Sequence, residues 1–126
     1  MKIAEVSKRY GLSADTLRYY ERIGLLPNVT RNTSGVRDYG EQDCARVQFV
    51  KCMRGAGVSI EALIEYMALF EQGEQTAAAR KALLEEQRDL VKQRIADMQA
   101  GLDRLNDKIE NYESMLAAER EIRGDA

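Results

Sequence analysis

The chain has 126 residues, of which 44% are hydrophobic and 32% charged. This composition is typical of one globular or helical domain, and it is too charged for a membrane protein and too apolar for a disordered chain. No apolar run approaches the roughly 18 residues that span a bilayer, and no signal peptide opens the sequence. We therefore expect a cytoplasmic protein with no membrane partner.

Neither a metal site nor an enzyme active site is expected. The sequence has no histidine, which removes the commonest general base and the commonest zinc ligand. Its two cysteines, Cys44 and Cys52, cannot form a four-thiolate site in one chain. If they share a helix, their Cα atoms lie about 12 Å apart, which is too far for a disulfide.

The two halves of the chain carry opposite charge. Residues 1–60 contain ten Lys and Arg against six Asp and Glu, a balance of +4, and residues 61–126 contain nine against fifteen, a balance of −6. This asymmetry indicates a head that binds a polyanion and a solvated tail that associates with itself.

Two short helices are predicted first, joined by a tight turn at Gly11. Apolar residues at helical spacing place the first helix before Gly11, and Ser13 can cap a second over residues 14–23. At 100° per residue, Arg18, Tyr19 and Arg22 face away from Leu17. Two helices around a glycine turn, with basic and aromatic side chains outward, indicate a helix-turn-helix.

A β-hairpin wing is predicted next. Short strand-like pieces at 29–31 and 36–39 flank a turn rich in Asn, Ser and Gly. The wing carries side chains suited to gripping phosphates, namely Arg31, Arg37 and Tyr39. For Tyr39 the alternative is packing at the end of a strand. Two further helices should follow, the third ending at Gly55 and the fourth running from the cap at Ser59 to Gly73.

The rest of the chain is predicted to be one long helix from Thr76 to about Ala118. Apolar residues repeat at alternating gaps of four and three, which is the heptad pattern of a coiled coil. We call these positions the seam: Val91, Ile95, Met98, Leu102, Leu105, Ile109, Tyr112 and Leu116. One chain cannot cover the seam, so a homodimer is expected. The predicted fold is mainly α, with a winged helix-turn-helix domain at 1–73 and a coiled-coil dimerisation helix with a short tail at 74–126.

Three runs of sequence, at residues 3–7, 17–26 and 31–39, resemble the MerR family of bacterial transcription regulators. The resemblance covers residues 1–73 in order and spacing, and the long helix is similar to that family's dimerisation helix. It implies a homodimer held by an antiparallel coiled coil on double-stranded promoter DNA. In such regulators the inducer makes the dimer distort an over-long promoter spacer, which realigns the promoter for RNA polymerase.

Carried over residue by residue, the resemblance assigns DNA contacts to the second helix and the wing. Arg18 and Tyr19 would reach phosphates and base edges in the major groove, flanked by Thr16 and Arg22. From the wing, Arg37 and Tyr39 would grip the adjacent backbone.

Within the family, the third helix is similar to that of a small subgroup responding to reactive carbonyls or nitrosative stress. The residues that carry this similarity are 49–54 and 56–66. No cysteine follows Cys52 and no ligand domain follows the long helix, so neither the metal or iron–sulfur members nor the drug-responsive members fit, and no cofactor is expected. Cys52 would be the nucleophile that senses the electrophile. The alternative is a cysteine that is simply packed, which is the expectation for Cys44.

Two other classes of function stay open. One is a DNA-binding regulator or architectural protein without a thiol sensor, controlled by a protein partner. The other is a coiled-coil adaptor whose head no longer binds DNA.

Overall fold

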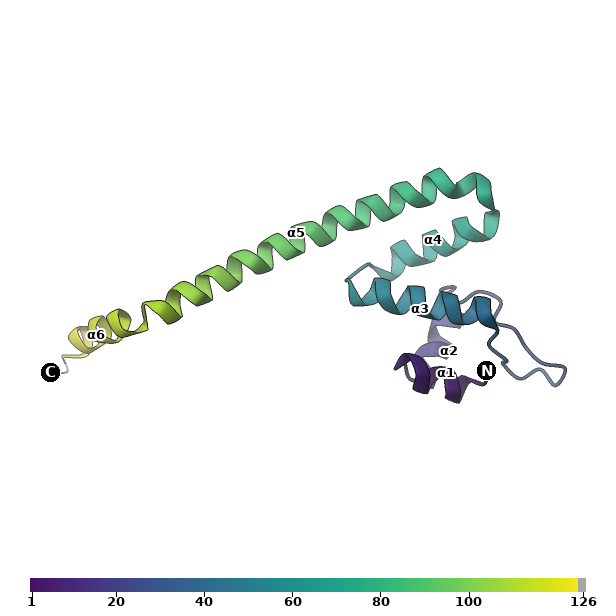
Figure 1. Ribbon diagram of the computed structural model, residues 1–126, viewed down its shortest axis with the longest axis horizontal. Helices are drawn as coiled ribbons and strands as arrows, with labels where there is room; N and C mark the ends of the chain where they lie inside the picture. The colour runs from purple at the N-terminus through teal and green to yellow at the C-terminus, as the bar shows by residue number, and fades with distance from the viewer. Residues whose placement is uncertain (125–126) are drawn as a thin grey trace. The chain divides into compact units, whose positions relative to one another are not determined.

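The structure is a computed structural model that describes residues 1–124, and it is mainly helical (Figure 1). The helices are α1 (Ile3–Tyr10), α2 (Ala14–Arg22), α3 (Glu41–Gly55), α4 (Ile60–Gln72), the short 3-10 helix η1 (Glu74–Thr76), α5 (Ala77–Glu110) and α6 (Tyr112–Arg123). The chain divides into two compact units, Met1–Val91 and the chain from Lys92 onward. The start of α5 therefore lies in the same unit as α1–α4. We call this first unit, Met1–Val91, the head; it includes the loop between α2 and α3.

The first four helices begin and end at the residues that local chemistry favours. Gly11 ends α1 in a left-handed conformation with φ 69°, which costs glycine little. The Ser13 hydroxyl accepts a hydrogen bond from the Thr16 N–H at 3.1 Å, and Ser59 accepts one from Ala62 at the same distance. Each satisfies a backbone donor that the first turn of its helix leaves free.

The head is built around one apolar core. Its fully buried side chains come from α1, α2, the loop after α2, α3 and α4: Val6, Leu17, Leu25, Leu26, Val47, Val50 and Leu63. Leu83 from the start of α5 packs against them. Because Leu17 is completely buried, the opposite side of α2 is held outward.

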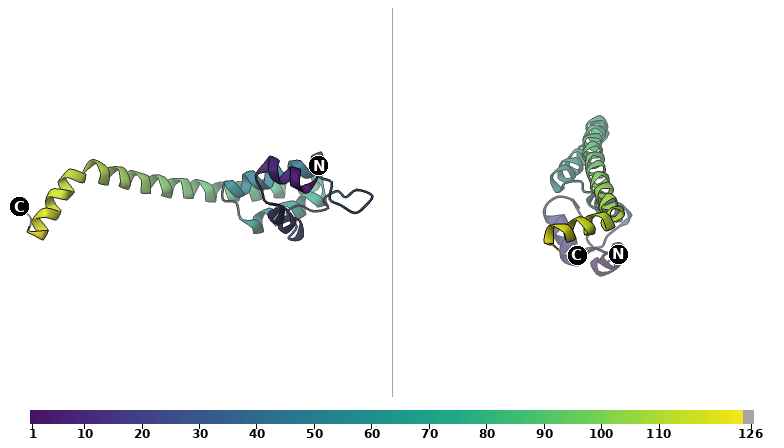
Figure 2. Two further views of the ribbon diagram at one scale, coloured as in Figure 1. Left: turned by 90° about the horizontal axis from the view of Figure 1, so that it is seen from below. Right: turned by 90° about the vertical axis from the view of Figure 1, so that its left-hand side faces the viewer.

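The predicted β-hairpin is not formed. Over residues 1–124 the structure has one isolated antiparallel bridge, between Arg31 and Arg37, and no strand. Figure 2 shows this wing loop, residues 29–39, as an irregular loop that projects outward from the helices of the head. Backbone donors that would extend a ladder are taken by side chains: Asn32 Oδ1 accepts from the N–H groups of Ser34 and Val36 at 2.9 and 3.1 Å, and Asp43 accepts from Thr30 at 3.3 Å.

The single long helix expected from Thr76 to Ala118 is interrupted. Asn111 leaves the helical conformation with φ −96° and ψ 12°, and it separates α5 from α6. Its side-chain amide donates to the carbonyl oxygen of Asp107 at 2.8 Å, a local hydrogen bond of the kind that lets asparagine compete with helical structure. Tyr112 and Leu116 consequently lie on α6, while the seam from Val91 to Ile109 lies on α5.

Candidate DNA-binding surface

The outward side of α2 presents the three side chains that the sequence predicted. Arg18, Tyr19 and Arg22 are all exposed. The Arg22 guanidinium lies over the Tyr19 ring, 5.3 Å from its centroid, so the two side chains support each other. Arg18 forms an ion pair with Asp15 at 3.0 Å, and Asp15 is almost fully exposed. An exposed pair of this kind contributes little to stability, so Arg18 can leave it for another anion.

Thr16 is half-buried at the start of α2. Its backbone N–H donates to Ser13 Oγ, and its hydroxyl oxygen accepts from the same serine hydroxyl at 2.9 Å. The structure therefore gives Thr16 a role in the helix cap, and its predicted contact with DNA stays a prediction.

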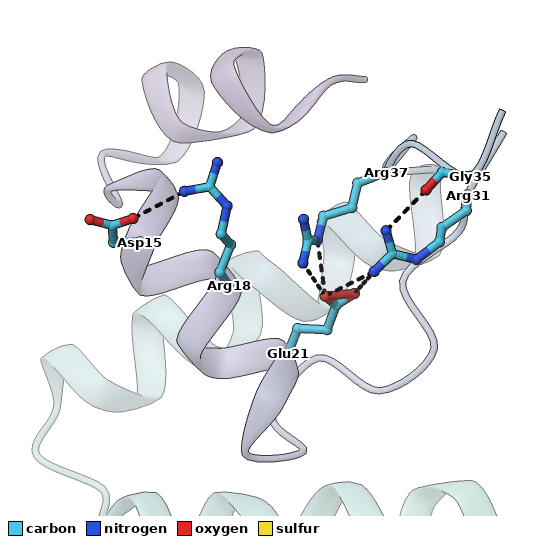
Figure 3. A network of polar contacts seen from close by, with 6 residues as sticks. All are labelled: Asp15, Arg18, Glu21, Arg31, Gly35 and Arg37. Atoms are coloured by element: carbon cyan, nitrogen blue, oxygen red, sulfur yellow. Dashed lines mark hydrogen bonds and ion pairs between the residues drawn. The ribbon is translucent and has the colours of Figure 1, made fainter.

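Glu21, at the end of α2, connects the wing loop to the helix (Figure 3). Arg37 Nε donates to Glu21 Oε2 at 2.9 Å, and Arg37 Nη2 lies at the same distance from that oxygen. Arg31 Nη2 lies 3.4 Å from Glu21 Oε1, and Arg31 Nη1 donates to the carbonyl oxygen of Gly35 at 3.2 Å. One carboxylate thus holds both wing arginines beside the helix that carries Arg18.

Tyr39 is buried in the core, with only 2% of its surface exposed. Its hydroxyl is buried and has no hydrogen-bond partner within the part of the chain that the structure describes. Burial raises the pKa of the Tyr39 hydroxyl above its ordinary value, and the negative charge of Glu21 adds to the rise. This position agrees with the packing alternative, and a DNA contact through Tyr39 stays a prediction.

The end of the wing loop is held by the start of the chain. The Met1 amino group donates to Asp38 Oδ1 at 2.9 Å and to the carbonyl oxygen of Tyr39 at 2.8 Å. The hydrogen bond to Asp38 raises the pKa of this amino group above its ordinary value. The Tyr39 N–H donates in turn to the Met1 carbonyl oxygen at 2.7 Å. The loop is therefore tied down at Glu21 and again at Met1.

The two cysteines differ in exposure. Cys52, near the end of α3, is exposed, and the Gln48 side-chain amide contacts its sulfur at 3.3 Å. Cys44, near the start of the same helix, is half-buried and packs against the core. Of the two cysteines, Cys52 is therefore the more accessible to a reagent in solution.

Most of the seam is open in the single chain. The exposed fractions of Met98 and Ile109 are 76% and 70%, and Ile95, Leu102, Leu105 and Tyr112 are also exposed. Val91 and Leu116 are half-buried. A row of large apolar side chains at heptad spacing is costly to leave in water.

Sequence reasoning missed Glu21 and Asp43. Both are carboxylates that fix the wing loop: Glu21 through its arginines, and Asp43, which is buried, through the N–H groups of Gly40 and Thr30 at 2.9 and 3.3 Å. The position of Asp43 in the first turn of α3 pointed to the helix dipole. No sequence signal showed that the loop would return to Glu21.

Two kinds of feature are absent from residues 1–124. No helix there combines the length and the apolar character needed to cross a bilayer. No cluster of three or more His, Cys, Asp or Glu side chains there is arranged to hold a metal ion.

The sequence matches two family descriptions that together cover most of the chain. Residues 1–69 match the MerR HTH family regulatory proteins, and residues 44–108 match the description "MerR, DNA binding". The chain belongs to the MerR family. The resemblance seen in the sequence motifs is thereby confirmed.

Among relatives in this family, AdhR of Bacillus subtilis, an HTH-type transcriptional regulator, is 58% identical over 88 residues. The match covers 70% of this chain and 63% of AdhR, so the chain spans less than two thirds of that regulator's length. The transcriptional regulator ZntR of Escherichia coli is 33% identical over 110 residues, covering 84% of this chain and 78% of ZntR.

Two solved structures are similar over nearly the whole chain. A protein from Listeria monocytogenes assigned to the MerR family matches with a TM-score of 0.87 and 51% identity, covering 98% of this chain and 95% of that one. HiNmlR, a MerR family regulator lacking the sensor domain and bound to promoter DNA, matches with a TM-score of 0.80 and 32% identity over 92% of both chains.

Proposed function

We propose that this MerR family member is a transcription regulator that binds promoter DNA through α2 and the wing loop. The observation that carries the proposal is the link through Glu21. It keeps the wing arginines Arg31 and Arg37 beside the helix that presents Arg18 outward. Arginine on a recognition helix suits base edges, and arginine on an adjacent loop suits backbone phosphates. The similarity to HiNmlR, which was solved bound to promoter DNA, supports DNA binding by this chain.

Thr16, Tyr19 and Arg22 complete the proposed contact from α2. Tyr19 and Arg22 are exposed and stacked, which suits them to the sugar–phosphate backbone at the edge of the groove. Tyr39 anchors the end of the wing loop in the core. Any contact of its hydroxyl with a phosphate requires the buried ring to shift.

A homodimer is the form in which the protein binds DNA in this proposal. The occupant of the seam is a second copy of α5 and α6, because the heptad spacing matches that of a partner with the same repeat. An antiparallel pair would leave one head at each end. This arrangement suits two half-sites on one face of the duplex.

A hydroxyl-radical footprint on the DNA upstream of the protein's own gene tests the proposal. Two protected segments separated by one or more helical turns are expected, since each head of a dimer covers one half-site. A single protected segment would contradict the dimer. If no segment is protected at any protein concentration below the one at which non-specific binding saturates the DNA, sequence-specific DNA binding is contradicted.

The regulation that we propose is activation by electrophiles through Cys52. AdhR is 58% identical to the chain over the matched residues, and the Cys52 thiol is exposed. The sulfur adds to the carbonyl carbon of an aldehyde while the thiol proton ends on the carbonyl oxygen, giving a hemithioacetal with no other product. The adduct on α3 would change packing in the head, and the dimer would then distort the promoter spacer for RNA polymerase.

Transcription in vitro with and without a small aldehyde tests this regulation. Wild type and Cys44→Ser should respond, and Cys52→Ser should bind the promoter without responding. If all three proteins respond equally, the thiol is not the sensor. If none responds although all bind, the electrophile proposal falls, and control by a protein partner becomes the next hypothesis.

A further inference from the structure

We propose that Glu21 is a positioning residue: by holding the wing arginines in place on the phosphates, it fixes the register in which α2 meets the bases of the promoter. The inference rests on the proposed DNA binding and deepens it. Glu21 is acidic, yet it lies on the surface that we propose binds DNA, which is itself acidic. A carboxylate there repels phosphates, so its presence needs a compensating role.

The compensating role is visible in the contacts. Glu21 is 18% exposed and Arg37 25% exposed, so their ion pair is more shielded from solvent than the Arg18–Asp15 pair. Glu21 comes from α2, whereas Arg31 and Arg37 come from opposite sides of the wing loop. The carboxylate therefore connects three separate points of the backbone. The loop contains a single bridge in place of strands, and Glu21 ties it to α2.

The arginines keep donors for DNA while they are held. A guanidinium has five N–H donors in a planar fork. The contacts of Arg37 use Nε and Nη2, and within residues 1–124 its Nη1 has no protein partner. Arg31 uses Nη1 and Nη2 and leaves Nε. Each arginine can thus contact Glu21 on one side and a phosphate on the other, with its side chain already ordered before DNA arrives.

Asp15 provides a matched control on the same helix. It also pairs with an arginine of the surface, but the pair lies three residues apart within α2 and connects no separate element. Glu21→Gln and Asp15→Asn each remove one negative charge next to one or more arginines. Only the first removes the link between α2 and the wing loop.

The test compares affinities for the promoter duplex and for a scrambled duplex, measured by fluorescence anisotropy. Glu21→Gln should weaken promoter binding roughly tenfold, in the range of coupling between neighbouring charged residues, and should leave scrambled-duplex binding equal or tighter. Asp15→Asn should keep the ratio of the two affinities within about twofold of wild type, since its charge change is sequence-independent. A Glu21→Gln variant that behaves as Asp15→Asn does would overturn the inference.

The sign of the effect of Glu21→Gln on promoter affinity in a second background distinguishes a positioning role from loss of fold. In an Arg31→Gln, Arg37→Gln background, Glu21 faces the phosphates without its partners. Adding Glu21→Gln there should tighten promoter binding, because only a repulsive charge is removed. If it weakens binding in both backgrounds, Glu21 does not act through the arginines.

Amide hydrogen exchange of residues 31–38 supplies a readout without DNA. Faster exchange in Glu21→Gln, with unchanged exchange in the core of α3, is the expected result. Unchanged exchange in the loop would overturn the inference even if binding changed. Failure of the wild type to distinguish the two duplexes would instead contradict the proposed function, so the two failures are distinguishable.

Discussion

Tyr39 places a hydroxyl in the apolar core without a partner in the described chain. A buried polar group without a hydrogen bond costs roughly 1–3 kcal/mol. Tyr39→Phe should therefore leave the free energy of unfolding unchanged or raise it by about 1 kcal/mol, as measured by urea denaturation. A decrease of more than about 1 kcal/mol would mean that the hydroxyl has a partner, such as a bound water.

The same residue predicts a pH dependence. Because the folded state raises the pKa of Tyr39 above its ordinary value of 10.0, the unfolded chain loses this proton first as the pH rises. The free energy of unfolding should consequently fall above about pH 10. The free energy of unfolding of Tyr39→Phe should fall less steeply over the same range. Identical slopes for the two proteins would contradict the shift.

The two cysteines should react at different rates. Cys52 is exposed and Cys44 is half-buried against the core, so an alkylating reagent in excess should modify Cys52 first. Mass spectrometry of peptides after timed quenching measures both rates in one sample. Faster modification of Cys44 would remove the structural basis for choosing Cys52 as the sensor.

At the scale of elements, helix caps should contribute measurably to the head. Ser13→Ala removes the acceptor for the Thr16 N–H at the start of α2 and should lower the free energy of unfolding by about 0.5–2 kcal/mol. Ser34→Ala is the control, because the Ser34 side chain makes no hydrogen bond in the described structure. Equal effects of the two substitutions would show that the cap is not the cause.

The helices of the head could be predicted because their limits depend on nearby residues. Gly11 and Gly55 mark ends, Ser13 and Ser59 mark starts, and apolar spacing shows the buried side. The wing loop could not be predicted in the same way. The side chains of Asn32 and Asp43 accept from the N–H groups of Val36 and Thr30, which would otherwise extend the bridge, and strand-like composition does not reveal that competition.

The candidate site was predictable only in part. The exposure of Arg18, Tyr19 and Arg22 follows from the burial of Leu17 on the opposite side of α2. The burial of Tyr39 and the bonds of Glu21 depend on how segments distant in sequence come together. A similar limit applies to the long helix that the sequence predicted. The heptad repeat continues past Asn111, although α5 ends just before that residue.

At the scale of the whole molecule, the exposed seam predicts the oligomeric state. Leu102→Glu places a charge in the seam and should give a monomer of 14.3 kDa in sedimentation equilibrium, where wild type should have twice that mass. Ala100→Glu introduces the same side chain two residues away, on the other side of α5, and should remain a dimer. A wild-type monomer at micromolar concentration would contradict the proposed assembly.

The most direct test of DNA recognition through α2 is promoter affinity as a function of salt for wild type, Arg18→Gln and Arg88→Gln. Arg88 is an exposed arginine on α5, outside the proposed surface. Arg18→Gln should raise the Kd roughly tenfold or more, and it should reduce the slope of log affinity against log salt by about one for each phosphate that the side chain no longer neutralises. Arg88→Gln should match wild type in both. If Arg18→Gln and Arg88→Gln are indistinguishable, or if binding does not depend on salt, α2 is not the element that reads the promoter.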